Sequence, residues 1–299
     1  MSNSVKAHVF ILSANIIYGI NYSIGKIALA SIPAFGIVGF RVVFACIIFW
    51  GLHRIFSMEM VEKSDHPKLI LASVFGVIIN QLLFFKGLSL TSEMHSALIM
   101  ITTPLLVLLM AWIMLKDRIT IAKLTGIGIG AIGVCLLILS GSTDSSSDAS
   151  AIGDICIMIN AASYAIFLVM AKPLMQKYAP LTIAKWIFTY AVIPVLIFAW
   201  SDLNSVTYSE VPLQAWLALA VVVIGATVLA YLFNILGLQY GSPALVSIYI
   251  YTQPIIASAI SLSMGNDTLT PLKILSALLV FSGVALVSFK KEVSANKQA

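Results

Sequence analysis

The chain has 299 residues, of which 60% are hydrophobic and only 10% are charged, and its formal net charge is +5. Because an ordinary soluble domain carries about 25% charged residues, this composition excludes a water-soluble fold of the same size. We interpret the positive excess as basic residues that orient membrane helices, and we expect no nucleic-acid partner.

Long uncharged apolar runs recur along the chain, as over residues 69–85, 97–115 and 244–264. Each approaches or exceeds the roughly 18 residues typical of a transmembrane helix. A lone strand in lipid leaves its backbone polar groups unsatisfied, so these runs are predicted to be helical. The sequence therefore predicts an all-α, polytopic membrane protein. The ten predicted transmembrane helices are 8–30, 34–56, 68–88, 94–115, 121–140, 152–175, 181–200, 212–236, 243–264 and 271–289.

The first span carries Asn15 and Tyr18, which lie three residues apart and therefore share a helix face. Asn160 and Tyr164 form a similar face in the sixth span. Because polar groups are costly in lipid, these faces either line a cavity or bond to a neighbouring helix. We expect the first span to be retained rather than cleaved as a signal peptide, since amides are unusual in the apolar core of a signal peptide.

Arg41, in the second span, is the one charge well inside an apolar run with no acidic residue nearby in sequence. It lies seven residues into the span, about 10 Å from its outer end. One interpretation is that its side chain snorkels to the interface or bonds loop carbonyls. The other is that its planar guanidinium clamps the carboxylate of an amino-acid-like substrate.

The third and eighth spans also carry polar and aromatic side chains at equivalent places. The third has Asn80, Gln81 and Phe84, and the eighth has Tyr231 and Asn234, which follow Gln81 and Phe84 by 150 residues. As in the first span, these side chains are expected either to line a cavity or to bond between helices.

The fourth and ninth spans contain Pro104 and Pro254. A proline frees the carbonyl four residues earlier and kinks the helix. Freed carbonyls tend to face a cavity, so Tyr251 and Gln253 beside Pro254 are further candidates for lining one. The two prolines serve either as hinges for a rocking motion or as fixed kinks for packing.

The two halves of the chain align without a gap over a long stretch when one is shifted by 150 residues. The matched pairs include Thr102 with Thr252, Pro104 with Pro254, Asp117 with Asp267, Lys123 with Lys273, and Gly133 with Gly283. Near the N-terminus, a shift of 146 brings Lys26 onto Lys172. Because each half has an odd number of spans, the second enters the membrane from the opposite side, as in secondary transporters with inverted repeats. The predicted repeats are residues 1–141 and 142–299, each with five spans.

Basic residues of the predicted connections gather on one side of the membrane. They include Lys6, Arg54, Lys63, Lys68, Lys116, Arg118, Lys177 and Lys290. The opposite loops at 141–151 and 201–211 carry acidic residues without Lys or Arg. This bias predicts that both termini are cytoplasmic. We expect a multi-pass protein of the bacterial cytoplasmic (inner) membrane.

One set of motifs lies at residues 86–92, 97–104, 112–120 (WIMLKDRIT) and 126–136, and a second copy lies at 237–241, Pro254, 267–270 and Gly283. Together these segments resemble EamA-type members of the drug/metabolite transporter superfamily. The resemblance implies a ten-helix, inverted five-plus-five transporter, often an exporter of amino acids or related metabolites. It also implies a central cavity lined by the first four helices of each half, with the fifth and tenth helices outside it.

Other mechanisms lack their characteristic residues. The histidines fall at helix ends or in loops without HExxH spacing, and the chain has no GxxxxGK[ST] loop and no CxxC pair. We therefore expect no enzyme activity, no catalytic residues, no metal and no cofactor. A sensory or scaffold role is disfavoured by the short loops.

The substrate and its coupling remain open at this level. No acidic residue lies mid-span, so facilitated diffusion, or coupling through a less obvious group, is favoured over the glutamate-based proton coupling of small multidrug relatives. Aromatic and amide candidates favour a neutral or zwitterionic small molecule. The alternative is uptake or exchange of another solute, such as a sugar-phosphate or a drug-like compound. The expected partners are the small-molecule substrate and the lipid bilayer, with the chain acting as a monomer.

Overall fold

The computed structural model describes residues 2–91, 96, 99–140, 150–263 and 270–295. Within these ranges every regular element is helical, which confirms the predicted all-α fold class. Five helical stretches are long and apolar enough to cross a membrane, and α1, which is bent by 40° at a break, makes a sixth. Shorter apolar helices, of which there are four among the described residues, account for the other predicted spans.

The elements follow the predicted spans in order. In the first half they are α1 (Asn3–Leu29), α2 (Ala34–Phe56), η1 (Lys63–Asp65), α3 (His66–Ser73), η2 (Val74–Ile78), α4 (Ile79–Leu90), α6 (Thr103–Leu115) and α7 (Ile121–Ser140). In the second half they are α8 (Ala151–Lys177), α9 (Pro180–Ser205), η3 (Tyr208–Glu210), α10 (Leu213–Val221), η4 (Val222–Leu229), α11 (Ala230–Tyr240), α12 (Pro243–Ile248), η5 (Tyr249–Tyr251), α13 (Thr252–Ser263) and α14 (Pro271–Ala295).

At several helix starts, a serine side chain accepts a hydrogen bond from a free backbone amide of the first turn, or a proline removes such an amide hydrogen. Ser2, Ser150 and Ser242 each accept a hydrogen bond from a backbone amide of the helix that follows. Pro180 and Pro271 stand at the first helical position, where a missing amide hydrogen costs nothing. The spans therefore begin where the local sequence favours it.

Four predicted spans are interrupted rather than uniformly α-helical. The third and eighth spans each contain a π-helical segment, η2 and η4, at matching places in the two repeats. The ninth changes to a 3-10 turn, η5, just before Pro254. In the fourth, a turn at Ile101 and Thr102 precedes α6, and most of the predicted helix before that turn lies outside the described residues. Such irregular backbone is tolerated at membrane depth where protein or a cavity surrounds it.

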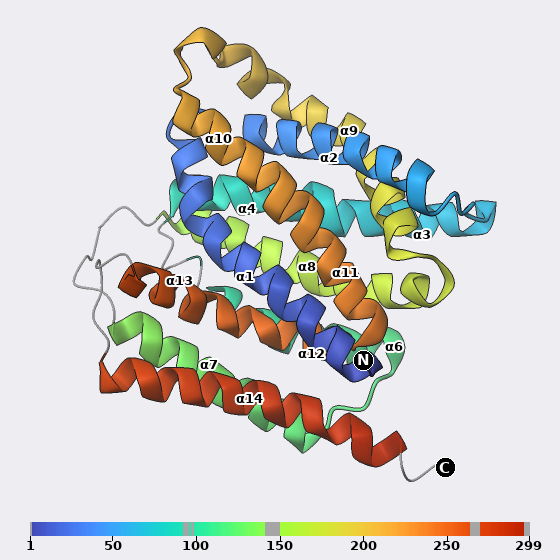
Figure 1. Ribbon diagram of the computed structural model, residues 1–299, viewed down its shortest axis with the longest axis vertical. Helices are drawn as coiled ribbons and strands as arrows, with labels where there is room; N and C mark the ends of the chain where they lie inside the picture. Colours follow the sequence, from blue (N-terminus) through green and yellow to red (C-terminus); the bar gives the residue numbers. More distant parts are fainter. Residues whose placement is uncertain (1, 92–95, 97–98, 141–149, 264–269, 296–299) are drawn as a thin grey trace.

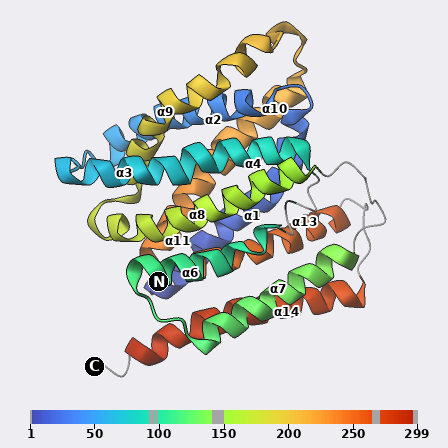
Figure 2. The same ribbon diagram turned by 180° about the vertical axis from the view of Figure 1, so that it is seen from behind.

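The helices form two layers closed by a helix pair at each edge. Figure 1 and Figure 2, which view the molecule from opposite sides, place α2 beside α9 at one edge and α7 beside α14 at the other. Between these edges, α1, α10–α11 and α12–α13 lie in one layer, and α4, α6 and α8 lie in the other. Each layer therefore combines helices of both repeats.

Equivalent residues of the two repeats make equivalent contacts. Gly87 in α4 packs on Ile157 in α8, and Gly237 in α11 packs on Ile11 in α1. A Cβ atom added at Gly87 would lie 2.7 Å from the Ile157 side chain, and one added at Gly237 would lie 2.3 Å from the Ile11 side chain. The two glycines differ by 150 positions and the two isoleucines by 146, which are the shifts seen in the sequence. The contacts therefore repeat with the pseudo-symmetry of an inverted repeat.

Two lysines repeat the same relationship at the ends of these helices. Lys26 Nζ donates to the carbonyls of Leu88 and Thr91, at 2.7 and 3.2 Å. Lys172, its equivalent, donates to the Leu238 carbonyl at 2.7 Å and to two further carbonyls at the end of α11. A cation there complements the negative end of the helix dipole. In each repeat, the first helix (α1 or α8) is thus tied to the end of the third span (α4 or α11).

Close backbone contact holds the outer pair, α7 and α14, together. A Cβ added at Gly126 would lie 2.9 Å from the Gly283 carbonyl, and one added at Gly133 would lie 2.8 Å from the Ser276 carbonyl. Small residues at such spacing are typical of tightly packed membrane helices. As expected from the family resemblance, this pair lies apart from the site described next.

Candidate functional site

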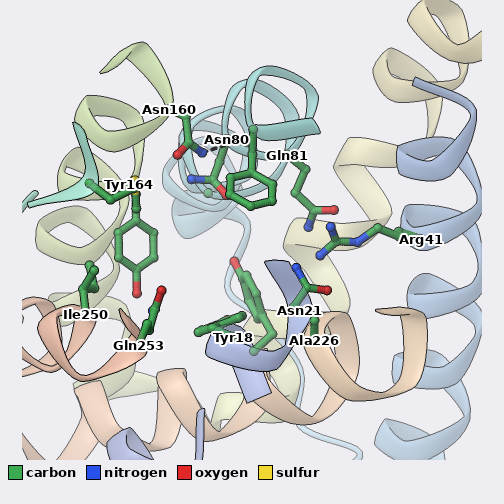
Figure 3. Close-up of a pocket in the computed structure, with 14 residues that line it drawn as sticks. Tyr18, Asn21, Arg41, Asn80, Gln81, Asn160, Tyr164, Ala226, Ile250 and Gln253 are labelled. Carbon is green, nitrogen blue, oxygen red and sulfur yellow. Dashed lines mark hydrogen bonds between the residues drawn. The ribbon is translucent and has the colours of Figure 1, made fainter. Parts of the chain in front are cut away.

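A cavity of about 100 Å³ lies inside the bundle, between the two repeats. About 10–15 Å³ on this scale holds one water, so the cavity has room for several waters or for part of a small solute. Its lining residues are Tyr18, Asn21, Arg41, Gly76, Asn80, Gln81, Phe84, Met100, Asn160, Tyr164, Ala226, Tyr231, Ile250 and Gln253. Figure 3 shows polar side chains converging on it from several helices.

The irregular segments of the fold contribute directly to the wall. Gly76 and Ala226 lie in the two π-helical segments, and Ile250 lies in the 3-10 turn η5. Gly76 also lets α8 approach, because an added Cβ would lie 2.4 Å from the ring of Phe167. Short π-helical segments are frequent at functional sites, since they re-aim side chains and free backbone groups. The cavity therefore lies where the helices depart from regular geometry.

Arg41 supplies the only formal charge among the lining residues that the structure describes. Its side chain is buried, its Nε donates to Thr227 Oγ1 at 2.8 Å, and its guanidinium carbon lies 4.7 Å from the centroid of the Phe85 ring. Thr227 in turn donates to the Val222 carbonyl within the π-helical segment, at 3.0 Å. Figure 3 shows the guanidinium pointing into the cavity. Among the described residues, its terminal nitrogens have no hydrogen-bond acceptor, so they are available to a ligand.

A chain of amide groups fixes the orientation of Gln253. Asn15 Nδ2 donates to the Ile11 carbonyl at 2.8 Å, and Asn15 Oδ1 accepts from Gln253 Nε2 at 2.7 Å. Because both nitrogens are committed as donors, Gln253 Oε1 is the free end of the chain. Gln253 is 6% exposed and lines the cavity, so it presents an oriented acceptor there.

Helix α8, which is the sixth predicted span, is held by two further hydrogen bonds. Asn160 Nδ2 donates to the Asn80 carbonyl at 2.7 Å, and Tyr164 Oη accepts from Asn234 Nδ2 at 2.7 Å. Both bonds link α8 to a neighbouring helix, so the positions of Asn160 and Tyr164 are set by packing as well as by their own helix. Figure 3 places Asn160, Tyr164 and Gln253 across the cavity from Arg41.

Most of the site residues predicted from sequence come together in this cavity. Those that line it are Tyr18, Arg41, Asn80, Gln81, Phe84, Asn160, Tyr164, Tyr231 and Gln253. Asn15 and Asn234 do not line it and instead hold Gln253 and Tyr164. Tyr251 also lies outside the lining, because its hydroxyl donates to the Ile101 carbonyl at 2.8 Å and its ring packs on Gly130.

Asn21 is the polar lining residue that the sequence interpretation missed. It lies three residues after Tyr18, so the helical spacing that pointed to Tyr18 would also have found it. The carbonyl-bearing residues Met100 and Ile250, four positions before the two prolines, also line the cavity. The prolines themselves are not among the lining residues.

The lining is rich in groups that form hydrogen bonds. Among the described residues it contains one guanidinium, four amide side chains besides Gln253, and three phenols, with no His, Cys, Asp or Glu. In the part of the chain that the structure describes, no three such metal-ligating residues form a group. The lining therefore offers hydrogen bonds and one positive charge to an organic solute.

The EamA-like transporter family model matches this chain twice, over residues 5–139 and 151–289. These two ranges cover most of the chain, and the gap between them falls between α7 and α8. The match therefore repeats the two-part organisation seen in both the sequence and the contacts.

Two curated relatives and one solved structure are similar to this chain. The chain is 29% identical to the "Uncharacterized transporter YyaM" of Bacillus subtilis over 238 residues, covering 77% of each chain. It is 24% identical to the "Uncharacterized transporter YetK" of the same organism, covering 96% of this chain and 88% of the relative. A solved crystal structure superposes with a TM-score of 0.77 at 16% identity, covering 96% of this chain and 99% of the other, which shows a shared fold.

Proposed function

The chain belongs to the EamA-like transporter family, and from this premise we propose that it exports amino acids or related carboxylate-bearing metabolites through the central cavity. In this proposal the two repeats rock against each other, so that the cavity opens alternately to the two sides of the membrane. The protein is a multi-pass membrane transporter, and we place it in the bacterial cytoplasmic membrane with both termini in the cytoplasm.

The uncompensated charge of Arg41 is the observation that carries the substrate assignment. A buried cation within the membrane is costly, and among the described lining residues no carboxylate offsets it. The guanidinium is held through Nε, which leaves the two terminal nitrogens for a planar, two-point contact with a carboxylate. The contact with Thr227 deep in the bundle favours the substrate clamp over the alternative that Arg41 snorkels to the interface.

The proposal treats the protein as a transporter without enzyme activity or cofactor. Amide and phenol groups bind and orient a solute, whereas catalysis needs a nucleophile with a base, or a metal. A site for a sugar-phosphate would be expected to hold more than one basic group, and Arg41 is the only one among the described lining residues. An amino acid or related monocarboxylate therefore fits the site better.

The test is efflux from proteoliposomes loaded with a labelled amino-acid mixture. Selective efflux by the parent protein is expected, and Arg41→Met should abolish it, because about 1.5–3 kcal/mol is lost with each hydrogen bond to a charged group. Arg54→Gln is the matched control, since Arg54 is an exposed arginine at the other end of the same helix. Normal efflux by Arg41→Met, or no amino-acid efflux by the parent, would overturn the proposal.

A further inference from the structure

The two repeats carry different side chains at one pair of equivalent positions near the cavity. Gln253 in α13 is equivalent to Thr103 in α6, since the two differ by 150 positions. Gln253 bonds to Asn15 of the facing helix α1 and presents its oxygen to the cavity. Thr103 instead directs its hydroxyl to Met100 Sδ at 3.8 Å and does not line the cavity. The site is therefore asymmetric although the scaffold is symmetric.

We propose that Gln253 Oε1 is a subsite for a donor group of the solute, specifically a protonated amine, and that Asn15 is the residue that positions it. This inference rests on the proposed function and adds a direction to it, with the carboxylate at Arg41 and the amine on the opposite wall. Figure 3 shows Gln253 and Arg41 facing the cavity from opposite sides.

The hydrogen-bond order of the amide chain supports the assignment of an acceptor at this point. The Ile11 carbonyl can only accept, so it fixes the nitrogen of Asn15, and the oxygen of Asn15 then fixes the nitrogen of Gln253. Rotating the Gln253 amide by half a turn would place two oxygens against each other. The Gln253 oxygen is therefore held toward the cavity, and it lacks a hydrogen-bond donor among the described residues.

The surroundings favour an amine over a neutral apolar group at this wall. Gln253 is 6% exposed as a whole residue and lines the cavity, so a donor for its free oxygen would have to come from within the cavity. On the same side, Asn160 Oδ1 is a buried acceptor without a partner among the described residues. Both oxygens bring partial negative charge to the side opposite Arg41, whose guanidinium is the formal charge of the described lining.

The experiment compares ligands that differ only in the amine. Purified protein in detergent would be titrated with L-leucine or with 4-methylpentanoate, and with L-phenylalanine or with 3-phenylpropanoate, and binding would be read from the shift in unfolding temperature. In the parent protein, we expect each amino acid to bind at least tenfold more tightly than its deaminated analogue, because one charge-assisted hydrogen bond is lost.

Variants then separate the subsite from general stability. Gln253→Leu should bring the affinity ratio between amine and deaminated ligand close to one, because only the amino acid loses a hydrogen bond. Asn15→Leu should lower the ratio in the same direction, since Gln253 then loses its fixed orientation. Thr103→Val is the matched control at the equivalent position of the other repeat, and it should keep the parent ratio.

The outcomes distinguish this inference from the function on which it rests. If the parent binds both ligands of a pair equally well, or if Gln253→Leu retains the parent ratio, the amine subsite is wrong while the carboxylate site stands. If the parent binds neither the amino acids nor the deaminated acids, both the proposed function and the subsite fail. A loss of the ratio in Gln253→Leu and Asn15→Leu, but not in Thr103→Val, supports the subsite.

Discussion

The side chain of Arg41 in the first repeat is anchored by Thr227 of the second, through a 2.8 Å hydrogen bond from Nε to Oγ1. Thr227 is completely buried and lies in the π-helical segment η4. The same hydroxyl donates to the Val222 carbonyl, so its oxygen is held with a lone pair toward Arg41. The direction of the guanidinium is therefore set by the irregular helix of the opposite repeat.

Thr227→Val should weaken binding of a carboxylate solute because Arg41 loses this anchor. Hydrogen bonds to charged groups contribute about 1.5–3 kcal/mol, which corresponds to roughly a tenfold to hundredfold loss of affinity. Thr227→Ser keeps the hydroxyl and should bind like the parent. Binding is measured by ligand titration of purified protein. Parent-like affinity in Thr227→Val would show that Arg41 does not need this contact.

Gly237→Ala should destabilise the fold, because the new methyl group would overlap the side chain of Ile11. Overpacking of this kind costs about 1–3 kcal/mol. Ile11→Ala in the same chain removes the overlap, and should restore part of the loss. Gly51→Ala is the control, since nothing lies within 4 Å of an added Cβ there. Thermal unfolding in detergent measures the stability of each variant. An unfolding temperature of Gly237→Ala equal to that of the parent would contradict the contact.

The fold class and the pairing of the repeats were accessible from sequence for a physical reason. The membrane demands long apolar helices, and the repeat leaves matched residues such as Lys26 and Lys172 at constant shifts. The structure shows these lysines at equivalent helix ends. The π-helical segments left no comparable signal, because Val74–Ile78 reads as an ordinary apolar run.

The candidate site was only partly accessible, because a polar residue on a helix face has two destinations. Asn15 and Tyr18 share a face, yet Tyr18 lines the cavity while Asn15 bonds to Gln253. Asn234 likewise bonds to Tyr164 instead of lining the cavity. The choice depends on how each helix is rotated and how closely its neighbours approach, and both depend on contacts between segments far apart in the sequence.

The topology can be tested by thiol labelling. Lys63→Cys and Ser205→Cys place single thiols at exposed positions on what we predict are opposite sides of the membrane. The natural cysteines Cys46, Cys135 and Cys156 would be replaced by alanine first. In intact cells, a membrane-impermeant maleimide should label only the thiol at position 205, because the basic loops are expected to face the cytoplasm. Labelling at position 63 alone would reverse the orientation.

The two prolines offer a test of the rocking motion itself. Pro254 follows the 3-10 turn η5, and Pro104 follows the turn at Ile101 and Thr102, so each stands just after a break in its helix. The two breaks touch, because Tyr251 donates its hydroxyl hydrogen to the carbonyl of Ile101, its equivalent in the other repeat. If the breaks bend during transport, replacing a proline by alanine adds an amide hydrogen and stiffens the helix there.

We therefore expect Pro254→Ala and Pro104→Ala to lower the turnover rate several-fold with little change in solute affinity, since neither proline lines the cavity. Pro194→Ala is the control, because Pro194 lies inside α9, which contributes no lining residue. Turnover is measured as initial efflux from proteoliposomes, and affinity by ligand titration in detergent. A fixed kink predicts a different pattern, in which stability falls while turnover per folded molecule stays at the parent value. That pattern would remove the hinge role from both prolines and leave the contact between Tyr251 and Ile101 as a packing feature.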